Sequence, residues 1–309
     1  MSRCRMAVVL VALTTVAMLH AAAQTPVFRT GIDLATFGIT VIDRKGEFLT
    51  DLTTDDFEVL EDGQKQTIKY FARGTDTETG PEMHVGLLFD TSGSMSEDIK
   101  LSRSAAVKFL NTLSDAKDMT LVNFATEVNV AKYGQKDFPR MVERIRAPIP
   151  EGDTALFDAM GVYLDGASQD EGRKILVVFT DGGDTRSTIG FGDLMTLVRA
   201  SDATVYSVGF LEHSRGRVEE RSRLSQIAEA TGGQAFFPTT MKDIDAAYAK
   251  VVAQIRAQYS LAYTSSNARQ DGSWRKVEIR LVRPDLKGMK VLGRRGYFAP
   301  YQEPAAKTK

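Results

Sequence analysis

Oxygen-bearing side chains gather at three points along this sequence. The first is LLFDTSGSMS at residues 87–96, where Asp90, Ser92 and Ser94 stand at every second position. The second is EGDTALFDAM, which offers Thr154, and the third is VVFTDGGDTRS, in which Asp181 ends an apolar run. Carboxylates and hydroxyls are the ligands of hard cations such as Mg²⁺, which takes oxygen donors in octahedral geometry and keeps some of its waters.

The residue types in this set favour Mg²⁺ or Mn²⁺ over other metals. No His or Cys accompanies the five side chains, as zinc or copper would require, and Ca²⁺ prefers more carboxylates. The hydroxyls of Ser92, Ser94 and Thr154 are expected to bind directly, while Asp90 and Asp181 supply charge. Each residue alone also has a structural interpretation, as a helix cap or a turn residue. Their joint occurrence favours metal binding.

The elements that must position these residues lie between positions 82 and 257. Short apolar runs, such as HVGLLF, MTLVNF, KILVVFT and ATVYSVGF, alternate there with segments of helical periodicity. This pattern predicts an α/β fold, with a doubly wound, mostly parallel sheet and helices on both faces. NVAKYG is expected to be an antiparallel edge strand. Ligands of such sheets bind at the carboxyl ends of the strands, where the three oxygen-rich segments fall. His84, at the start of a strand, is expected to be a rim residue at the opposite end.

The segments on either side, residues 25–75 and 258–300, show the alternation of apolar and polar residues that is typical of β-strands. FEVLEDGQKQTIKYFA contains Asp62-Gly63 between alternating hydrophobic residues, which predicts a hairpin. We expect the two flanks to pack into one small β-sandwich, with the α/β domain inserted between them. Two separate β appendages are the alternative.

The first residues have the three-part pattern of a secretory signal peptide. Arg3 and Arg5 precede an apolar stretch from Met6 to Leu19, and small residues follow. We expect residues 1–23 to be removed and the chain to be exported to the periplasm, the cell surface or the medium. An uncleaved anchor is the alternative, but the stretch is shorter than the roughly 20 residues that span a bilayer. No membrane span is expected after cleavage, and the single cysteine, Cys4, would be lost with the signal peptide.

The five oxygen-bearing residues together resemble the metal-ion-dependent adhesion site (MIDAS) of the von Willebrand factor type A (VWA) domain. That motif is D-x-S-x-S on a first loop, a threonine on a second and an aspartate on a third, and Asp90, Ser92, Ser94, Thr154 and Asp181 match it. The flanks, with LTTDDFEVLEDG and GRRGYFAP, resemble those of the VWFA-related proteins of the acidobacterial type.

The resemblance implies an exported adhesion or scaffolding module and not an enzyme. In that family an Asp or Glu carboxylate of a partner protein completes the coordination of the metal. A structural envelope protein with a purely stabilising metal is the alternative, and a metal-dependent hydrolase is disfavoured because G-x-S-x-G and P-loop motifs are absent. A nucleic-acid partner is also disfavoured, since the net charge is −1 and the basic residues are dispersed.

Overall fold

The computed structural model describes residues 34–74, 80–113, 115–214 and 216–303. The predicted signal peptide, residues 1–23, lies outside these ranges. None of the described helices has both the length and the apolar character that crossing a membrane requires.

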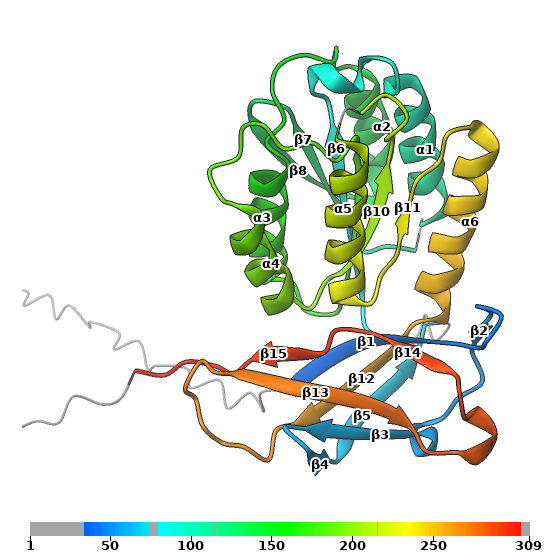
Figure 1. Ribbon diagram of the computed structural model, residues 1–309, viewed down its shortest axis with the longest axis vertical. Coiled ribbons are helices and arrows are strands. Elements are labelled where there is room, and N and C mark those ends of the chain that lie inside the picture. Colours follow the sequence, from blue (N-terminus) through cyan, green and yellow to red (C-terminus); the bar gives the residue numbers. More distant parts are fainter. Residues whose placement is uncertain (1–33, 75–79, 114, 215, 304–309) are drawn as a thin grey trace, which may run out of the picture. The chain divides into compact units, whose positions relative to one another are not determined.

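A six-stranded sheet forms the centre of the α/β domain (Figure 1), in the order β11-β10-β9-β6-β7-β8. All neighbouring strands are parallel except β7 and β8, which are antiparallel. The fold class predicted from the sequence is therefore confirmed, with NVAKYG in the expected edge strand. The strands are β6 (Met83–Asp90), β7 (Asp118–Phe124), β8 (Val128–Gly134), β9 (Arg173–Thr180), β10 (Thr204–Gly209) and β11 (Ala235–Phe236).

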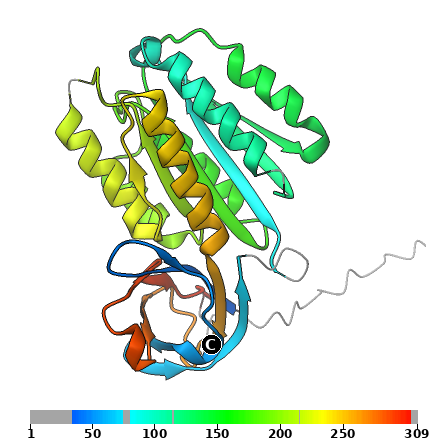
Figure 2. The ribbon, with the colours of Figure 1, turned by 90° about the vertical axis from the view of Figure 1, so that its right-hand side faces the viewer.

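Helices cover both faces of this sheet (Figures 1 and 2), which explains why its central strands are mostly apolar. Every residue of β6 is buried. One apolar cluster joins the sheet to α1, α2 and α6, and a second joins it to α3, α4 and α5. The helices are α1 (Ile99–Thr112), α2 (Phe138–Arg146), α3 (Leu156–Ala167), α4 (Phe191–Ala200), α5 (Arg217–Thr231) and α6 (Met241–Ala257).

Helix α2 is an element that the sequence analysis did not anticipate. Its sequence, FPRMVERIR, is short and highly charged, and it buries Met141 and Ile145, one turn apart. Two apolar residues at this spacing are enough to attach one face of the helix to the sheet. They are too few for the sequence alone to show that this segment is a helix and not a loop.

Two antiparallel sheets are built from segments at both ends of the described chain. One has the order β14-β1-β12-β5, with β2 beside β1, and the other has the order β15-β13-β3-β4. Each sheet pairs an N-terminal with a C-terminal strand, β1 with β12 and β3 with β13. The bounds are β1 (Leu34–Ile42), β2 (Phe48–Leu49), β3 (Phe57–Glu61), β4 (Gln64–Gln66), β5 (Ile68–Arg73), β12 (Tyr259–Thr264), β13 (Trp274–Leu281), β14 (Lys290–Leu292) and β15 (Gly296–Phe298).

The two sheets share one apolar core, so they form a sandwich. Phe37 of β1, Val59 of β3 and Tyr263 of β12 are fully buried in it. The predicted hairpin is present between β3 and β4, and its two turn residues, Asp62 and Gly63, have φ values of 48° and 83°. Positive φ at both positions is what a two-residue type I′ turn requires, and Asp-Gly meets this requirement at low cost.

Candidate metal centre

The three loops that carry the predicted ligands are joined by backbone hydrogen bonds. Gly93 of the first loop donates to the carbonyl of Gly152 in the second, at 3.0 Å. Thr185 of the third loop donates to the carbonyl of Thr154, at 2.9 Å, and the Thr154 amide donates to the Thr185 hydroxyl, at 3.0 Å. The second loop is thus held between the other two, and Thr154 lies, nearly fully buried, just before α3.

The first loop brings its carboxylate and hydroxyl groups together. Asp90 Oδ1 accepts the Ser92 amide at 2.9 Å, and the Ser92 and Ser94 hydroxyl oxygens are 3.1 Å apart. A cation about 2.1 Å from two adjacent octahedral ligands holds them about 3 Å apart. The separation of the serine oxygens therefore suits two ligands of one Mg²⁺ ion.

The two carboxylates of the predicted site carry charge that the protein does not balance. Asp90 is fully buried and Asp181 nearly so. Burial, reinforced by the nearby charge of Asp181, raises the pKa of Asp90 to about 7, and burial also raises the pKa of Asp181. Within the described residues, neither forms an ion pair with a lysine, arginine or histidine. Two desolvated acids without a counter-charge are the chemical environment in which a divalent cation is favoured.

Several side chains around this centre were not predicted. The Thr180 hydroxyl donates to Asp90 Oδ2 at 2.6 Å and so fixes that carboxylate. Burial, together with the charge of Asp181, raises the pKa of Glu220 on α5. Thr180 directly precedes Asp181, so the sequence could have indicated that it lies near the site. The position of Glu220 in the sequence does not indicate that it lies near these loops.

His213, in the loop that follows β10, contacts two acidic side chains near the first loop of this centre. Its Nδ1 is 3.2 Å from the carboxylate of buried Asp98, and its Nε2 is 3.2 Å from that of Glu97. The hydrogen bond to Asp98 raises the pKa of His213. The charge of Asp98 in turn contributes to raising the pKa of Asp181, so His213 and Asp98 border the candidate centre.

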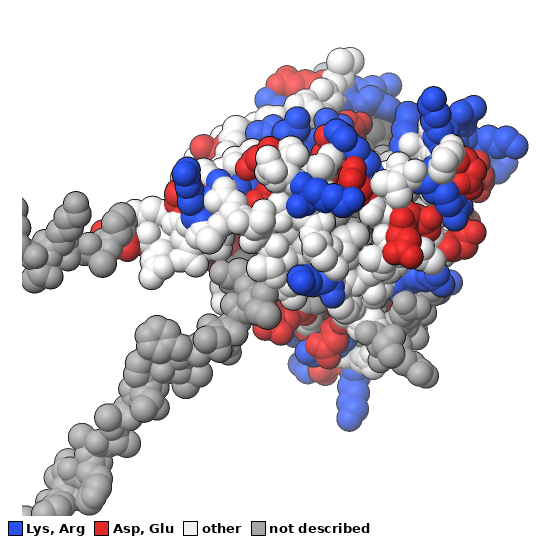
Figure 3. Space-filling view, turned by 90° about the horizontal axis from the view of Figure 1, so that it is seen from below, with Lys and Arg blue, Asp and Glu red and all other residues white. Residues whose placement is uncertain are grey.

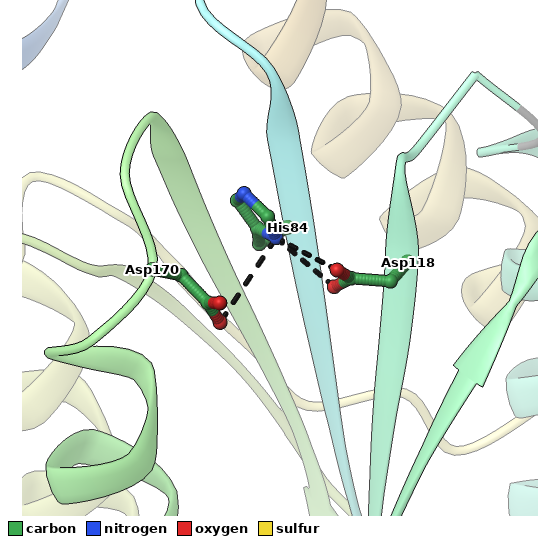
Figure 4. Close-up of side chains that lie close together, drawn as sticks. All are labelled: His84, Asp118 and Asp170. Carbon is green, nitrogen blue, oxygen red and sulfur yellow. Dashed lines mark hydrogen bonds and ion pairs between the residues drawn. The ribbon is translucent and has the colours of Figure 1, made fainter.

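A second group with metal-ligating residue types occurs at the other end of the sheet (Figure 4). His84, Asp118 and Asp170 offer ligand atoms within 4.8 Å of one another, which is compatible with a metal site. His84 lies at the start of β6, at the end of the sheet where it was predicted, but it is buried and belongs to this group, which the prediction of a rim residue did not anticipate. Its Nδ1 lies 3.0 Å from Asp118, and its Nε2 lies 2.9 Å from the Glu171 carbonyl.

The contacts of this second group describe an ion-pair network better than a metal site. The Lys132 ammonium lies 3.3 Å from the Asp118 carboxylate and 2.9 Å from that of Asp170, so it already supplies a bridging cation. Both ring nitrogens of His84 already lie within hydrogen-bond distance of protein acceptors, the Asp118 carboxylate and the Glu171 carbonyl. A metal here would have to displace Lys132, whereas none of the described basic side chains forms an ion pair with Asp90 or Asp181.

The α/β sheet and its loops define a class of domain, and the sequence identifies the family. Residues 84–250 match the model of the von Willebrand factor type A domain, and the chain belongs to this family. Domains of this family are typically interaction modules without enzymatic activity. A comparison with curated proteins finds no match.

Similar folds occur among solved structures. The PilB minor pilin from Streptococcus sanguinis is similar over 58% of this chain, with 13% identity and a TM-score of 0.46, and the chain spans 62% of that structure. The von Willebrand factor type A protein from Catenulispora acidiphila is similar over 88% of this chain and 74% of its own, with 13% identity and a TM-score of 0.46. The vWF domain of the type V pili tip protein Mfa5 from Porphyromonas gingivalis is similar over 57% of this chain and 95% of its own, with 11% identity and a TM-score of 0.47.

Proposed function

We propose that this chain is an exported, metal-dependent protein-binding module of the adhesion or scaffolding kind. In this proposal a Mg²⁺ or Mn²⁺ ion is held by a set of five residues and takes an Asp or Glu carboxylate of a partner protein as a further ligand. The five residues are Asp90, Ser92, Ser94, Thr154 and Asp181. Export is inferred from the leader-like residues 1–23.

The observation that carries the proposal is the pair of buried carboxylates without a counter-cation. Asp90 receives hydrogen bonds from the Ser92 amide and the Thr180 hydroxyl, and no basic side chain in the described part of the chain forms an ion pair with it. Donors of this kind orient a carboxylate without neutralising it. A divalent cation would neutralise Asp90 and Asp181 together and would relieve the repulsion between them.

The residues have separate roles in this proposal. The hydroxyls of Ser92, Ser94 and Thr154 are neutral ligands, so they would leave the bound metal more electrophilic toward a further ligand than directly bound carboxylates would. Asp90 and Asp181 retain the ion electrostatically. The metal itself supplies Lewis acidity and charge for an incoming carboxylate, which would lose its water in this contact, so that binding is selective and metal-dependent.

Affinity capture with three forms of the protein tests this function. Envelope extract is passed over the immobilised wild-type chain with Mg²⁺, over the same chain with EDTA, and over Asp90→Ala with Mg²⁺. Asp165→Ala, on an exposed part of α3, is the matched control. We expect the same partners on wild type and D165A with Mg²⁺, and their loss in the other two samples.

The result also separates binding from a purely stabilising metal. Equal recovery in all samples would remove the binding function. If Mg²⁺ raised the melting temperature of the wild-type chain at the same time, the metal would have a structural role only.

A further inference from the structure

Four basic side chains gather along one side of α1, the helix that packs beside α2 and α6 (Figure 1). Lys100, Arg103 and Lys108 of α1 and Arg146, the last residue of α2, line a hollow of about 530 Å³. We call it the α1 groove. The three α1 residues share one face of the helix, because positions three and eight residues apart align there. Among the described side chains that line the groove, none is acidic.

The positive charge of the α1 groove is only partly balanced by the protein. Lys108 pairs with Asp245 of α6 at 2.5 Å. Within the described part of the chain, Lys100, Arg103 and Arg146 form no ion pair with a carboxylate. The whole chain has 39 basic and 40 acidic residues, so its composition does not account for a surface of one sign. Like charges around one hollow repel one another and attract anions.

A partner can reach the charged groups of the groove. Lys100, Lys108 and Arg146 are exposed, and Arg103 is partly exposed. No rearrangement of the helix is needed to present them to solvent. The groove therefore offers its charge to a ligand on the surface, unlike the buried acids of the metal centre.

The groove begins at the loops of the candidate metal centre. Lys100 is the second residue of α1, which follows the first of these loops. The guanidinium of Arg103 donates to the carbonyl of Pro148 in the second loop, which connects α2 to α3. Gly152 of the same loop accepts the amide of Gly93 in the first. A partner segment whose carboxylate reached a metal at this centre could therefore continue along α1.

The dimensions and lining of the groove suit an extended peptide. From Lys100 to Lys108 the helix rises about 12 Å, which about four residues of extended chain span. Alternate side chains of such a segment point to the same side, so two carboxylates can face the cations at once. Asn111 also lines the groove. Its amide can donate to and accept from a peptide backbone, whereas an ionised phosphodiester offers acceptors only.

We infer that the α1 groove takes an extended acidic segment of the partner protein, next to the carboxylate that binds the metal. Lys100, Arg103 and Arg146 attract the Glu and Asp side chains of this segment and disfavour basic ones, so the groove contributes to selectivity. The inference rests on the proposed function, because the metal-bound carboxylate places the rest of the segment along α1.

Short fluorescent peptides test the groove. Each has a central Asp, and alternate residues on both sides of it are Glu, Gln or Lys, with Gly between them. Their affinity for the chain is measured by anisotropy with Mg²⁺ and with EDTA. With Mg²⁺ at low salt, the Glu peptide is expected to bind about tenfold more tightly than the Gln peptide, which is the combined effect of several exposed ion pairs. At about 0.5 M NaCl this preference should fall below about threefold, because salt screens exposed charges.

The double variant Lys100→Gln/Arg146→Gln removes two of the cations. Its matched control is Lys69→Gln/Lys290→Gln, which neutralises two exposed lysines of the sandwich. The preference for the Glu peptide should fall below about threefold in the first variant and persist in the control. An unchanged preference in K100Q/R146Q would overturn the inference.

Two further measurements on K100Q/R146Q separate partner binding from a structural role. Its affinity for the Gln peptide should stay within about twofold of the wild-type value. Its melting temperature should be equal or higher, because repulsion between like charges is relieved. Equal weakening of all three peptides would show that the two residues support the metal loops instead, and would overturn the inference.

Vesicles of phosphatidylglycerol test the other class of anion. We expect the wild-type chain and K100Q/R146Q to sediment with these vesicles to the same extent. If the variant lost sedimentation that the wild-type chain shows, and the Glu and Gln peptides bound equally, the groove would belong to an anionic membrane surface. The acidic segment would then be overturned.

The peptide series also distinguishes failure of the groove from failure of the proposed function. Mg²⁺-dependent binding of all peptides with equal affinity would overturn the groove and leave the metal-dependent function standing. A preference for the Glu peptide with the same affinity in Mg²⁺ and in EDTA would support the groove and contradict the metal-dependent function. No binding of any peptide would contradict both.

Discussion

At the scale of single residues, the behaviour of this domain depends on Asp90. Its carboxylate is fully buried, receives hydrogen bonds from Ser92 and Thr180, and lies near the second acid, Asp181. Its charge is therefore unfavourable in the metal-free protein, and under the proposed function it becomes favourable when a divalent cation binds. This difference between the metal-free and the metal-bound protein can be tested at Asp90 in two ways.

The first concerns pH. An acid whose pKa is raised in the folded state binds more protons there than when unfolded, so stability falls as pH rises between the two pKa values. For Asp90 this window extends from 3.8 to about 7. Chemical denaturation in EDTA should show stability declining from about pH 4 to pH 7 and levelling above it. Stability that increased over this range would contradict the raised pKa. With Mg²⁺ the decline should be reduced, since metal binding displaces the proton.

The second concerns Asp90→Asn, which removes the charge and keeps an oxygen for the Ser92 amide. In EDTA at pH 8 this variant should be more stable than the wild-type chain by roughly 2–4 kcal/mol, given the size of the pKa shift. Mg²⁺ should stabilise the wild-type chain and leave the variant unchanged. Denaturant titrations of both proteins measure this, and a D90N variant that Mg²⁺ stabilises equally would show that the ion binds elsewhere.

At the scale of elements, the sheet that carries the centre depends on close packing of α3 against β6. Gly86 lies in the middle of β6, and a Cβ atom there would stand 2.1 Å from the ring of Tyr163 on α3. Tyr163 is buried, and its hydroxyl lies 3.4 Å from the Ile175 carbonyl of β9. The glycine thus allows the aromatic ring to contact the strand backbone.

Gly86→Ala should therefore destabilise the protein by about 1–3 kcal/mol through overpacking. Gly166→Ala is the matched control, because its added methyl meets nothing within 4 Å and lies on α3. The control should be neutral or up to about 1 kcal/mol more stable, as expected for alanine in place of glycine in a helix. Equal stability of the two variants in urea denaturation would refute this account of the packing.

The elements differ in how well the sequence predicts them. β6 and β9 are apolar runs covered on both faces, and such runs can be recognised without any tertiary information. Helix α2 was missed because it has only two apolar anchors, Met141 and Ile145. Among the site residues, Asp90, Ser92, Ser94 and Asp181 lie at or just after the ends of β6 and β9, and Thr154 lies just before α3, so a motif can be read from the sequence. His213 and Glu220 were not predicted, because only the folding of the chain brings their loop and helix to the centre.

At the scale of the whole molecule, side chains of the sandwich contact the α/β domain. The guanidinium of Arg294 donates to the Ser201 carbonyl at 3.2 Å and to the Thr36 carbonyl at 2.5 Å, and it stacks over Phe37 at 4.5 Å. Ser201 follows α4, whereas Thr36 and Phe37 belong to β1.

On the surface seen in Figure 3, basic and acidic side chains are interspersed, which gives no continuous basic surface on that face.

Arg294→Ala should lower the free energy of unfolding by about 1–3 kcal/mol, since it removes both hydrogen bonds and the packing of the side chain. Arg295→Ala, at the exposed neighbouring position, should change it by less than about 0.5 kcal/mol. Thermal unfolding of the two variants checks this, and indistinguishable transitions would show that Arg294 does not stabilise the fold.

Titration calorimetry of Mg²⁺ into residues 24–309 of the wild-type chain tests the metal centre most directly, with Asp90→Ala as the comparison. We predict one saturable site on the wild-type chain, weaker at pH 5.5 than at pH 8, and no site on the variant. Absence of saturable binding at millimolar Mg²⁺ and Mn²⁺, or equal binding by the variant, would contradict a metal centre at Asp90.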